Sequence, residues 1–278
     1  MIEDFFLSGR CKLYSRFYPA ENPRAICVTL HGHGEHSGRY EKFQKILASE
    51  SISYAIFDYR GQGRSEGRDV YVDSFQDYLG DVSVFLQYLE HRFGVKEKII
   101  LHGNSLGALA AVHWAMVFPE KIRGMILSSP CFGLDLPEPL LLFNTLMNRV
   151  APSFVYKNPV YPPHLTHDPD EMRLYQKDAL IKRKISARLL YEMISYGRRL
   201  DAVPHFDFPF PVYMMAAELE KVVDGAKVKA FFEKINAPDK KLEMFPGFYH
   251  ELFHELEQDR AFETLRSYLR LICERTKA

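Results

Sequence analysis

Residues 98–118, KIILHGNSLGALAAVHWAMVF, join an apolar run to a run of small and apolar residues through the pentapeptide GNSLG. The first part, residues 98–103, predicts a buried strand, and residues 104–118 predict a helix. GNSLG fits the pattern G-x-S-x-G, in which a strand turns sharply into a helix and lifts the central serine above a sheet. Gly103 and Gly107 permit the tight backbone that such a turn needs. A glycine-rich turn with an incidental serine is the alternative, and the flanking strand and helix argue against it.

On both sides of this turn, predicted strands alternate with predicted helices. This alternation is typical of a mostly parallel sheet that is covered by helices on both faces. Together with the serine turn, it predicts an α/β protein with the α/β-hydrolase fold. The strands are expected at residues 11–19, 25–32, 53–61, 98–103, 122–130, 210–217 and 241–247, and the helices at 38–50, 75–93, 104–118, 225–235 and 260–276.

Residues 131–205 interrupt the alternation. Eight of the sixteen prolines fall between residues 130 and 169, so this stretch does not continue the regular sheet. Within it, residues 182–200 predict a helix with a basic face, and residues 139–150 predict a helix whose apolar stripe consists of Leu140, Phe143, Met147 and Val150. We interpret residues 131–205 as a helical cap, or lid, inserted into a core of residues 1–130 and 206–278. An ordinary packed subdomain without a role in substrate binding is the alternative.

The composition argues against several classes of protein. Lys plus Arg equals Asp plus Glu at 36 each, so nothing favours a nucleic acid as partner. Cys11, Cys27, Cys131 and Cys273 include no C-x-x-C pair for zinc or redox chemistry and do not form a disulfide framework. The N-terminus is acidic where a signal peptide needs a basic flank, and no run approaches the roughly 18 apolar residues of a membrane span. The sequence therefore predicts a soluble, cytoplasmic protein.

The serine of the turn needs a base, because a hydroxyl is a poor nucleophile until its proton is taken up. In this fold the triad follows the chain order serine, acid, histidine. Of the eleven histidines, only His250 and His254 lie beyond the helix predicted at residues 225–235. His250 follows the last predicted strand directly, where a loop can bring it over the sheet edge, whereas we expect His254 to be structural. Ser105 is thus the expected nucleophile and His250 the expected general base.

The acid should lie in the loop after the strand predicted at residues 210–217. This loop offers Glu218, Glu220 and Asp224. Asp224 directly precedes a predicted helix and can serve as its N-cap. Glu220 stands in the middle of the loop and is free to face the histidine. The residue pattern by itself leaves the choice between Glu220 and Asp224 open.

Acyl transfer also needs backbone N–H groups that stabilise the negative charge on the substrate oxygen. Leu106 follows the serine and offers one such group, and the glycine-rich turn after the strand at residues 25–32 offers a second. The same turn contains His31, His33 and His36, which could suggest a metal site. Because no matching set of ligands surrounds them, we expect no metal.

Five blocks of the sequence are HGHGEHSGRY (31–40), FDYRGQGRSEG (57–67), GNSLG (103–107), KVVD (221–224) and PGFYHE (246–251). Through these blocks the chain resembles the monoacylglycerol lipase and lysophospholipase family of serine hydrolases. The similarity covers nearly the whole chain, in order and at similar spacing. It implies hydrolysis of a single acyl chain from glycerol or from a lysophospholipid, beneath a mobile apolar cap and without a cofactor.

The resemblance also implies roles for single residues. Ser105 matches the nucleophile and His250 the base. His33 and Leu106 match the two oxyanion-hole residues, which act through their backbone N–H groups. Glu35 and Arg39 match polar positions that we expect to order the oxyanion loop.

Two positions depart from the family pattern. The family's acid is usually the aspartate of a G-x-x-D sequence, and the matching residues here are Ala217 and Glu220. Glutamate is one methylene longer, but it serves as the triad acid elsewhere in this fold, so the resemblance favours Glu220. The other departure is Asn104, which stands in the serine turn where histidine is common.

The sequence therefore predicts a carboxylic ester hydrolase that works through an acyl-enzyme, with Ser105, Glu220 and His250 as its triad. An aminopeptidase or a thioesterase is one alternative, and a non-catalytic relative that acts as a binding protein is another. Dehalogenase or epoxide-hydrolase chemistry would need an aspartate in place of Ser105. The expected partner is a small acyl ester, without an obligate protein partner, and the cap is a candidate surface for transient contact with a membrane or micelle.

Overall fold

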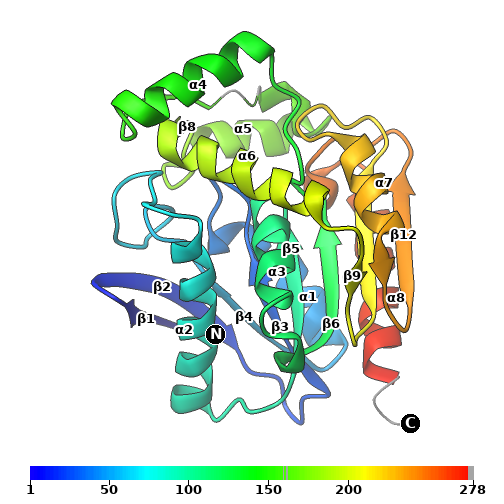
Figure 1. The fold of residues 1–278 in the computed structure, drawn as a ribbon. Coiled ribbons are helices and arrows are strands. Elements are labelled where there is room, and N and C mark those ends of the chain that lie inside the picture. Colours follow the sequence, from blue (N-terminus) through cyan, green and yellow to red (C-terminus); the bar gives the residue numbers. More distant parts are fainter. Residues whose placement is uncertain (159, 161, 275–278) are drawn as a thin grey trace.

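The computed structural model describes residues 1–158, 160 and 162–274. Its centre is an eight-stranded sheet with the spatial order β1-β2-β4-β3-β5-β6-β10-β12 (Figure 1). The first two pairs in this order, β1 with β2 and β2 with β4, are antiparallel, and all later pairs are parallel. The predicted, mostly parallel sheet is thereby confirmed. Its strands are β1 (Ile2–Ser8), β2 (Cys11–Tyr18), β3 (Ala25–Leu30), β4 (Ile52–Phe57), β5 (Ile99–Asn104), β6 (Ile122–Ser128), β10 (Val212–Ala217) and β12 (Lys240–Phe245).

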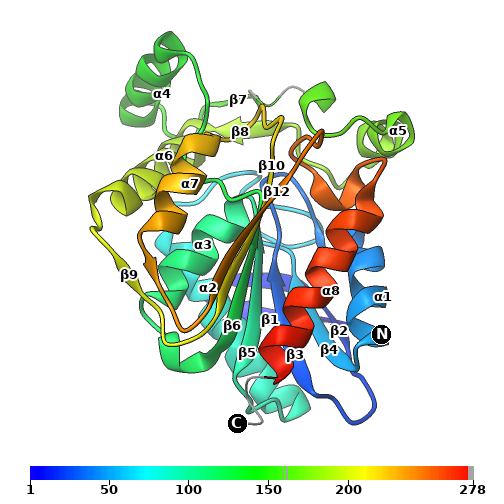
Figure 2. The same ribbon diagram turned by 90° about the vertical axis from the view of Figure 1, so that its right-hand side faces the viewer.

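Helices cover both faces of the sheet, because its central strands are apolar on both sides. Every residue of β3, β4 and β5 is buried. Along β3, Val28 packs into the core on one face and Cys27 into the core on the other, as the two-residue period of a strand requires. One face carries α1 (Glu41–Ser49) and α8 (Gln258–Glu274), and the other carries α2 (Gln76–Phe93), α3 (Leu106–Ala115) and α7 (Gly225–Glu233) (Figure 2).

The predicted insertion leaves the sheet after β6 and returns to it at β10. Its elements lie across the end of the sheet at which β5 runs into α3 (Figure 1). β7 and β8 pair antiparallel, and beyond the insertion the short strand β9 (Phe206–Asp207) pairs with β11 (Ile235–Asn236). The inserted elements are α4 (Glu138–Val150), β7 (Val155–Lys157), α5 (Pro169–Lys177), β8 (Lys184–Ser186) and α6 (Ala187–Ala202).

Several local predictions differ from the structure. β1 was not among the expected strands, and the helix expected at residues 182–200 begins only at Ala187, since Lys184–Ser186 form β8. The apolar stripe of α4 is not buried: Phe143 is 42% exposed and Val150 63%. The last two residues of the helix expected at 260–276 lie outside the described part of the chain. Among the described helices, none is long and apolar enough to cross a membrane.

Candidate active site

The backbone at Ser105 is held in an unfavourable conformation between β5 and α3. Its φ of 51° and ψ of −112° lie where residues other than glycine are rare. Such strain persists only when the surroundings enforce it. Here α3 packs tightly against β3: a Cβ on Gly107 would lie 1.9 Å from the backbone oxygen of Leu30, and a Cβ on Gly103 would lie 2.5 Å from that of Gly107. The sequence GNSLG therefore folds into a tight turn that presents the serine at the end of the sheet.

Three side chains from separate loops meet at this turn. The hydroxyl of Ser105 lies 3.0 Å from Nε2 of His250, and Nδ1 of the same imidazole lies 2.8 Å from Oε2 of Glu220. The side chains of His250 and Glu220 are only 5% and 7% exposed. A hydroxyl, a base that contacts it, and a carboxylate that orients the base form the arrangement required for an activated nucleophile.

The loop that follows β10 fixes the carboxylate of Glu220. Its second oxygen, Oε1, accepts hydrogen bonds from the backbone N–H groups of Lys221, Val222 and Val223 at 2.9, 2.8 and 3.3 Å. Burial by itself would raise the pKa of Glu220, but the neighbouring His250 and these N–H donors lower it below 4.5, so the carboxylate is charged at neutral pH.

Asp224, the other acid that the sequence left open, faces away from the imidazole. Its Oδ1 accepts from the N–H groups of Ala226 and Lys227 at 2.9 and 3.3 Å, at the start of α7. Asp224 is thus the N-cap of this helix. Of the two candidate carboxylates, only that of Glu220 contacts His250. Glu218 likewise has no side-chain contact with His250 among the hydrogen bonds of the described residues.

His250 is buried, and its charged form is nevertheless favoured. Burial disfavours the imidazolium, but the Glu220 carboxylate outweighs this effect and raises the pKa of His250 above its usual 6.5. The loop itself is fixed on both sides of the imidazole. Ser129 donates from its hydroxyl to the backbone oxygen of His250 at 2.5 Å, and the N–H of Glu251 donates to the oxygen of Leu165 at 2.8 Å. These two hydrogen bonds therefore fix the backbone that carries the imidazole of His250.

Two backbone N–H groups border the serine. Leu106 is the first residue of α3, and the first N–H groups of a helix have no partner within it. His33 lies in the loop after β3 and lines the same pocket as Ser105. Within the described chain, neither N–H donates to a protein acceptor, whereas those of Gly32 and Gly34 donate to Glu35 and Gln62.

The three histidines of this loop bind separate partners. His31 accepts from the N–H of Tyr59 at 3.0 Å, His33 contacts the backbone oxygen of Lys184 at 3.2 Å, and His36 lies 2.8 Å from Asp178. As far as the described residues go, no group of three or more His, Cys, Asp or Glu side chains is arranged to hold a metal ion.

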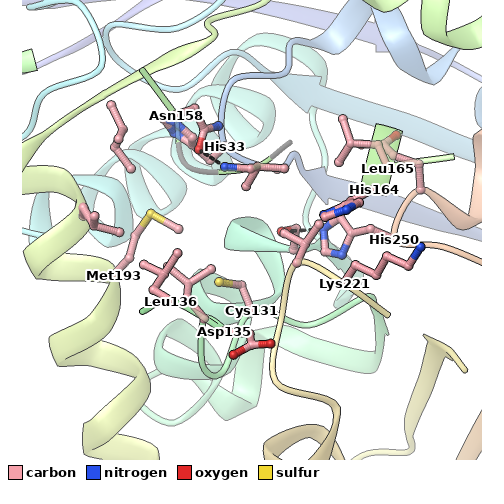
Figure 3. Close-up of a pocket in the computed structure, with 18 of the residues that line it drawn as sticks. His33, Cys131, Asp135, Leu136, Asn158, His164, Leu165, Met193, Lys221 and His250 are labelled. Carbon is pink, nitrogen blue, oxygen red and sulfur yellow. Dashed lines mark hydrogen bonds between the residues drawn. The ribbon is translucent and has the colours of Figure 1, made fainter. Parts of the chain in front are cut away.

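A cavity of about 440 Å³ opens above the serine, within the range of small-molecule sites. Met193 and Leu136 line one side of it, and His164, Leu165 and Lys221 lie on the side of His250 (Figure 3). Its apolar wall includes Leu134, Leu136, Leu140, Ile185, Leu190 and Met193.

The apolar stripe predicted at residues 139–150 contributes little to this wall. Of the predicted stripe, only Leu140 lines the cavity, and Phe143, Met147 and Val150 do not. α4 instead buries Asn144, and its residues Leu142, Phe143, Leu146 and Val150 are exposed. Ile185 of β8 and Leu190 and Met193 of α6 also form the wall, and Leu134 and Leu136 come from the segment before α4. Leu190 and Met193 are three residues apart and therefore lie on one face of the helix. This apolar face was missed in the sequence because the segment 182–200 is rich in basic residues.

The chain is similar to known proteins over most of its length. Residues 21–257 match the family model Hydrolase_4, described as "Serine aminopeptidase, S33". The chain is 29% identical over 275 residues to the uncharacterized protein YnbC of Escherichia coli, covering 96% of this chain and 46% of that protein. It is 28% identical to phospholipase YtpA of Bacillus subtilis, covering 90% of this chain and 97% of that protein. The chain thus spans less than half of the first relative and nearly all of the second.

A solved structure is similar over the whole fold. The crystal structure of Paleococcus ferrophilus monoacylglycerol lipase superposes with a TM-score of 0.85 at 26% identity, covering 94% of this chain and 99% of that one. The similarity therefore includes both the sheet and the elements inserted between β6 and β10.

Proposed function

The chain belongs to the serine aminopeptidase (S33) family of α/β-hydrolases, and we propose that it hydrolyses carboxylic esters of single acyl chains, of the monoacylglycerol or lysophospholipid type. The observation that carries this proposal is the hydrogen-bonded series Ser105, His250 and Glu220 beneath an apolar cavity. The names of the phospholipase YtpA and of the Paleococcus monoacylglycerol lipase support the substrate class.

In the proposed reaction, the oxygen of Ser105 attacks the ester carbonyl carbon while Nε2 of His250 takes the hydroxyl proton. The negative charge that develops on the carbonyl oxygen is stabilised by the N–H groups of His33 and Leu106. When the tetrahedral intermediate collapses, the C–O bond to the alcohol breaks and the alkoxide takes the proton from His250. Glu220 orients the imidazole and stabilises its charged form throughout.

Water completes the cycle by the reverse path. It attacks the acyl-enzyme carbonyl and gives a proton to His250, and the serine oxygen leaves with that proton as the fatty acid is released. Each bond that forms is matched by one that breaks, so the side chains and backbone groups named here are sufficient for the reaction.

We propose that residues 131–205 act as a cap that supplies the acyl-binding wall. Ile185, Leu190 and Met193 belong to this segment and line the cavity. Burial of each methylene of an acyl chain against such a wall is worth about 0.8 kcal/mol. The wall is therefore suited to a hydrocarbon chain.

We also infer that α4 is the part of the cap that meets a membrane or micelle surface. Leu142, Leu146 and Val150 are 65%, 55% and 63% exposed, which is unusual for side chains of this size on one helix. A cytoplasmic location is proposed as well, and the buried free thiols of Cys27 and Cys131 support it.

An activity-based experiment tests the proposed function. A fluorophosphonate probe is expected to label the native protein once and Ser105→Ala not at all, because only the activated hydroxyl attacks phosphorus. Labelling that persists in Ser105→Ala would contradict the assignment of the nucleophile. Circular dichroism of the variant should match the native protein, since only a hydroxyl is lost.

A substrate panel separates the proposed activity from its closest rival. Initial rates are to be compared on a monoacylglycerol, a lysophospholipid, an acyl thioester and an aminoacyl-arylamide. The proposal expects the oxygen esters to be hydrolysed fastest. A preference for the arylamide would instead favour the aminopeptidase activity after which the family is named.

A further inference from the structure

Two buried carboxylates, Glu35 and Glu251, face each other beside the triad. They are 4% and 8% exposed, both line the cavity above Ser105, and each carboxyl group shifts the pKa of the other. Glu35 follows the loop that carries His33, and Glu251 follows His250 directly. Two neighbouring carboxylates that are both buried cannot both be charged without strong repulsion, so they share one proton.

The partners of the two acids are unequal, which decides where this proton lies. Glu251 accepts from the guanidinium of Arg39 at 3.3 Å and lies 2.7 Å from Nδ1 of His254. Burial disfavours its charged form, but Arg39 outweighs burial and lowers the pKa of Glu251 well below 4.5. Burial and the neighbouring Glu251 together raise the pKa of Glu35 to about 7. The proton thus belongs to Glu35.

Other titratable groups surround the pair on every side. They come from the segment after the oxyanion loop, from α5 and from the loop of the base. These groups are Arg39, Tyr40, Glu171, Tyr175, His250 and His254.

Glu35 also holds the oxyanion loop. Its Oε2 accepts from the N–H of Gly32 at 3.0 Å and from the hydroxyl of Tyr40 at 2.8 Å. Among the hydrogen bonds of the described residues, Oε1 accepts only a long one from the amide of Asn104, at 3.5 Å, so we assign the proton of Glu35 to Oε1. Because Gly32 precedes His33, the position of this carboxyl group determines where the His33 N–H lies.

We propose that Glu35 is a positioning residue that works as a neutral carboxylic acid, donating its proton to Glu251 while it accepts from Gly32 and so fixes the oxyanion N–H of His33. This inference rests on the proposed function, since it concerns the same active site. When Glu35 loses its proton, two buried anions repel each other. Glu35 then moves away from Glu251 and takes Gly32 with it, and activity falls as the pH rises.

The experiment measures kcat/KM on a soluble ester between pH 5 and pH 10. For the native enzyme, kcat/KM is expected to fall as the pH rises through the pKa of Glu35, about 7. If only the protonated form is active, kcat/KM at pH 9 is about 100-fold lower than its maximum. Glu35→Gln keeps one donor and one acceptor in the same places but cannot ionise. This variant should stay active at its pH optimum and lack the descending limb.

Glu50→Gln is the matched control. Glu50 is another buried glutamate, 8% exposed and paired with Arg270 at 2.7 Å, at the far end of α1. Its variant should keep the native pH profile. The inference is overturned if Glu35→Gln retains the same descending limb as the native enzyme, or if the native enzyme is active without a limb in this range.

A second measurement does not depend on how well Glu35→Gln folds. Infrared spectroscopy of the native protein at pH 6 should show the C=O band of a protonated carboxylic acid, and this band should disappear as the pH rises through about 7. A native protein without such a band would overturn the inference. In contrast, a native protein that hydrolyses no ester and takes up no fluorophosphonate contradicts the proposed function itself.

Discussion

The carboxylate of Glu220 lies 2.8 Å from Nδ1 of His250, although a glutamate is one methylene longer than the aspartate common at this position in similar enzymes. The loop accommodates the extra length by turning three consecutive backbone N–H groups toward the second carboxylate oxygen. The acid is therefore held at both oxygens before any substrate binds.

We predict that Glu220→Gln is nearly inactive but folded. Without the carboxylate, the imidazole can adopt the wrong tautomer and its charged form is unsupported, a loss on the order of 10⁴ in kcat. The rate on a soluble ester measures this effect, and thermal unfolding checks the fold. Asp224→Asn is the control: asparagine keeps the capping oxygen, so this variant should retain nearly all of its stability and stay active. Activity that survives in Glu220→Gln and disappears in Asp224→Asn would contradict the assignment.

The acidic side of the pH profile should report His250. A general base must be neutral to accept the proton of Ser105, so activity is lost as the pH falls through the pKa of His250. Since Glu220 raises this pKa above 6.5, the midpoint of the native limb is expected above pH 6.5. Glu220→Gln loses the largest influence that raises the pKa of His250, so the limb should move to lower pH. The rate of inactivation by a fluorophosphonate, followed against pH, measures both midpoints, and a lower midpoint in the native enzyme would refute the prediction.

Hydrolysis should speed up with the length of the acyl chain until the cavity is full. Each additional methylene is worth about 0.8 kcal/mol, or about fourfold in affinity. Met193→Trp adds bulk to the wall and should shift the preferred chain to a shorter length. Leu174→Trp on α5 is the control, because Leu174 is 59% exposed and lies outside the cavity wall. Initial rates on p-nitrophenyl esters below their micellar concentrations test this, and a preference for acetate in the native enzyme would contradict it.

The serine turn should not tolerate a methyl group at Gly107. Gly107→Ala would place a Cβ 1.9 Å from the backbone oxygen of Leu30, so α3 must move away from β3. We expect a loss of about 3 kcal/mol in the free energy of unfolding. Gly80→Ala is the contrasting variant, since Gly80 lies in α2 with open space around it and should gain about 0.5–1 kcal/mol. Equal denaturation midpoints for the two variants would disprove the packing argument.

The elements with a strong local signal could be predicted from the sequence. β5 and α3 follow from an apolar run, two glycines and a run of small residues, and the structure has them at Ile99–Asn104 and Leu106–Ala115. β1 was missed because it is an edge strand that buries only Phe6 and Ser8, while Phe5 and Leu7 are 50% and 64% exposed. Its pattern depends on pairing with β2, which lies outside the segment itself.

The site could be predicted only in part, for a similar reason. Chain order and the position of the last strand are enough to single out His250. The contact of Glu220 with His250 depends on the backbone of residues 221–223, which no residue pattern specifies. The cavity wall depends on which face of α6 meets the sheet, and the pairing of Glu35 with Glu251 joins residues 216 positions apart.

α4 contributes one buried side chain, Asn144, to the whole molecule, whereas nine of the ten residues of α3 are buried. Segments with so few buried contacts open at a small fraction of the free energy needed for global unfolding. The backbone amides of α4 should therefore exchange with deuterium long before those of α3. We therefore expect α4 to unfold and refold locally while α3 and the sheet stay folded, and we propose that this local opening admits the substrate to the cavity.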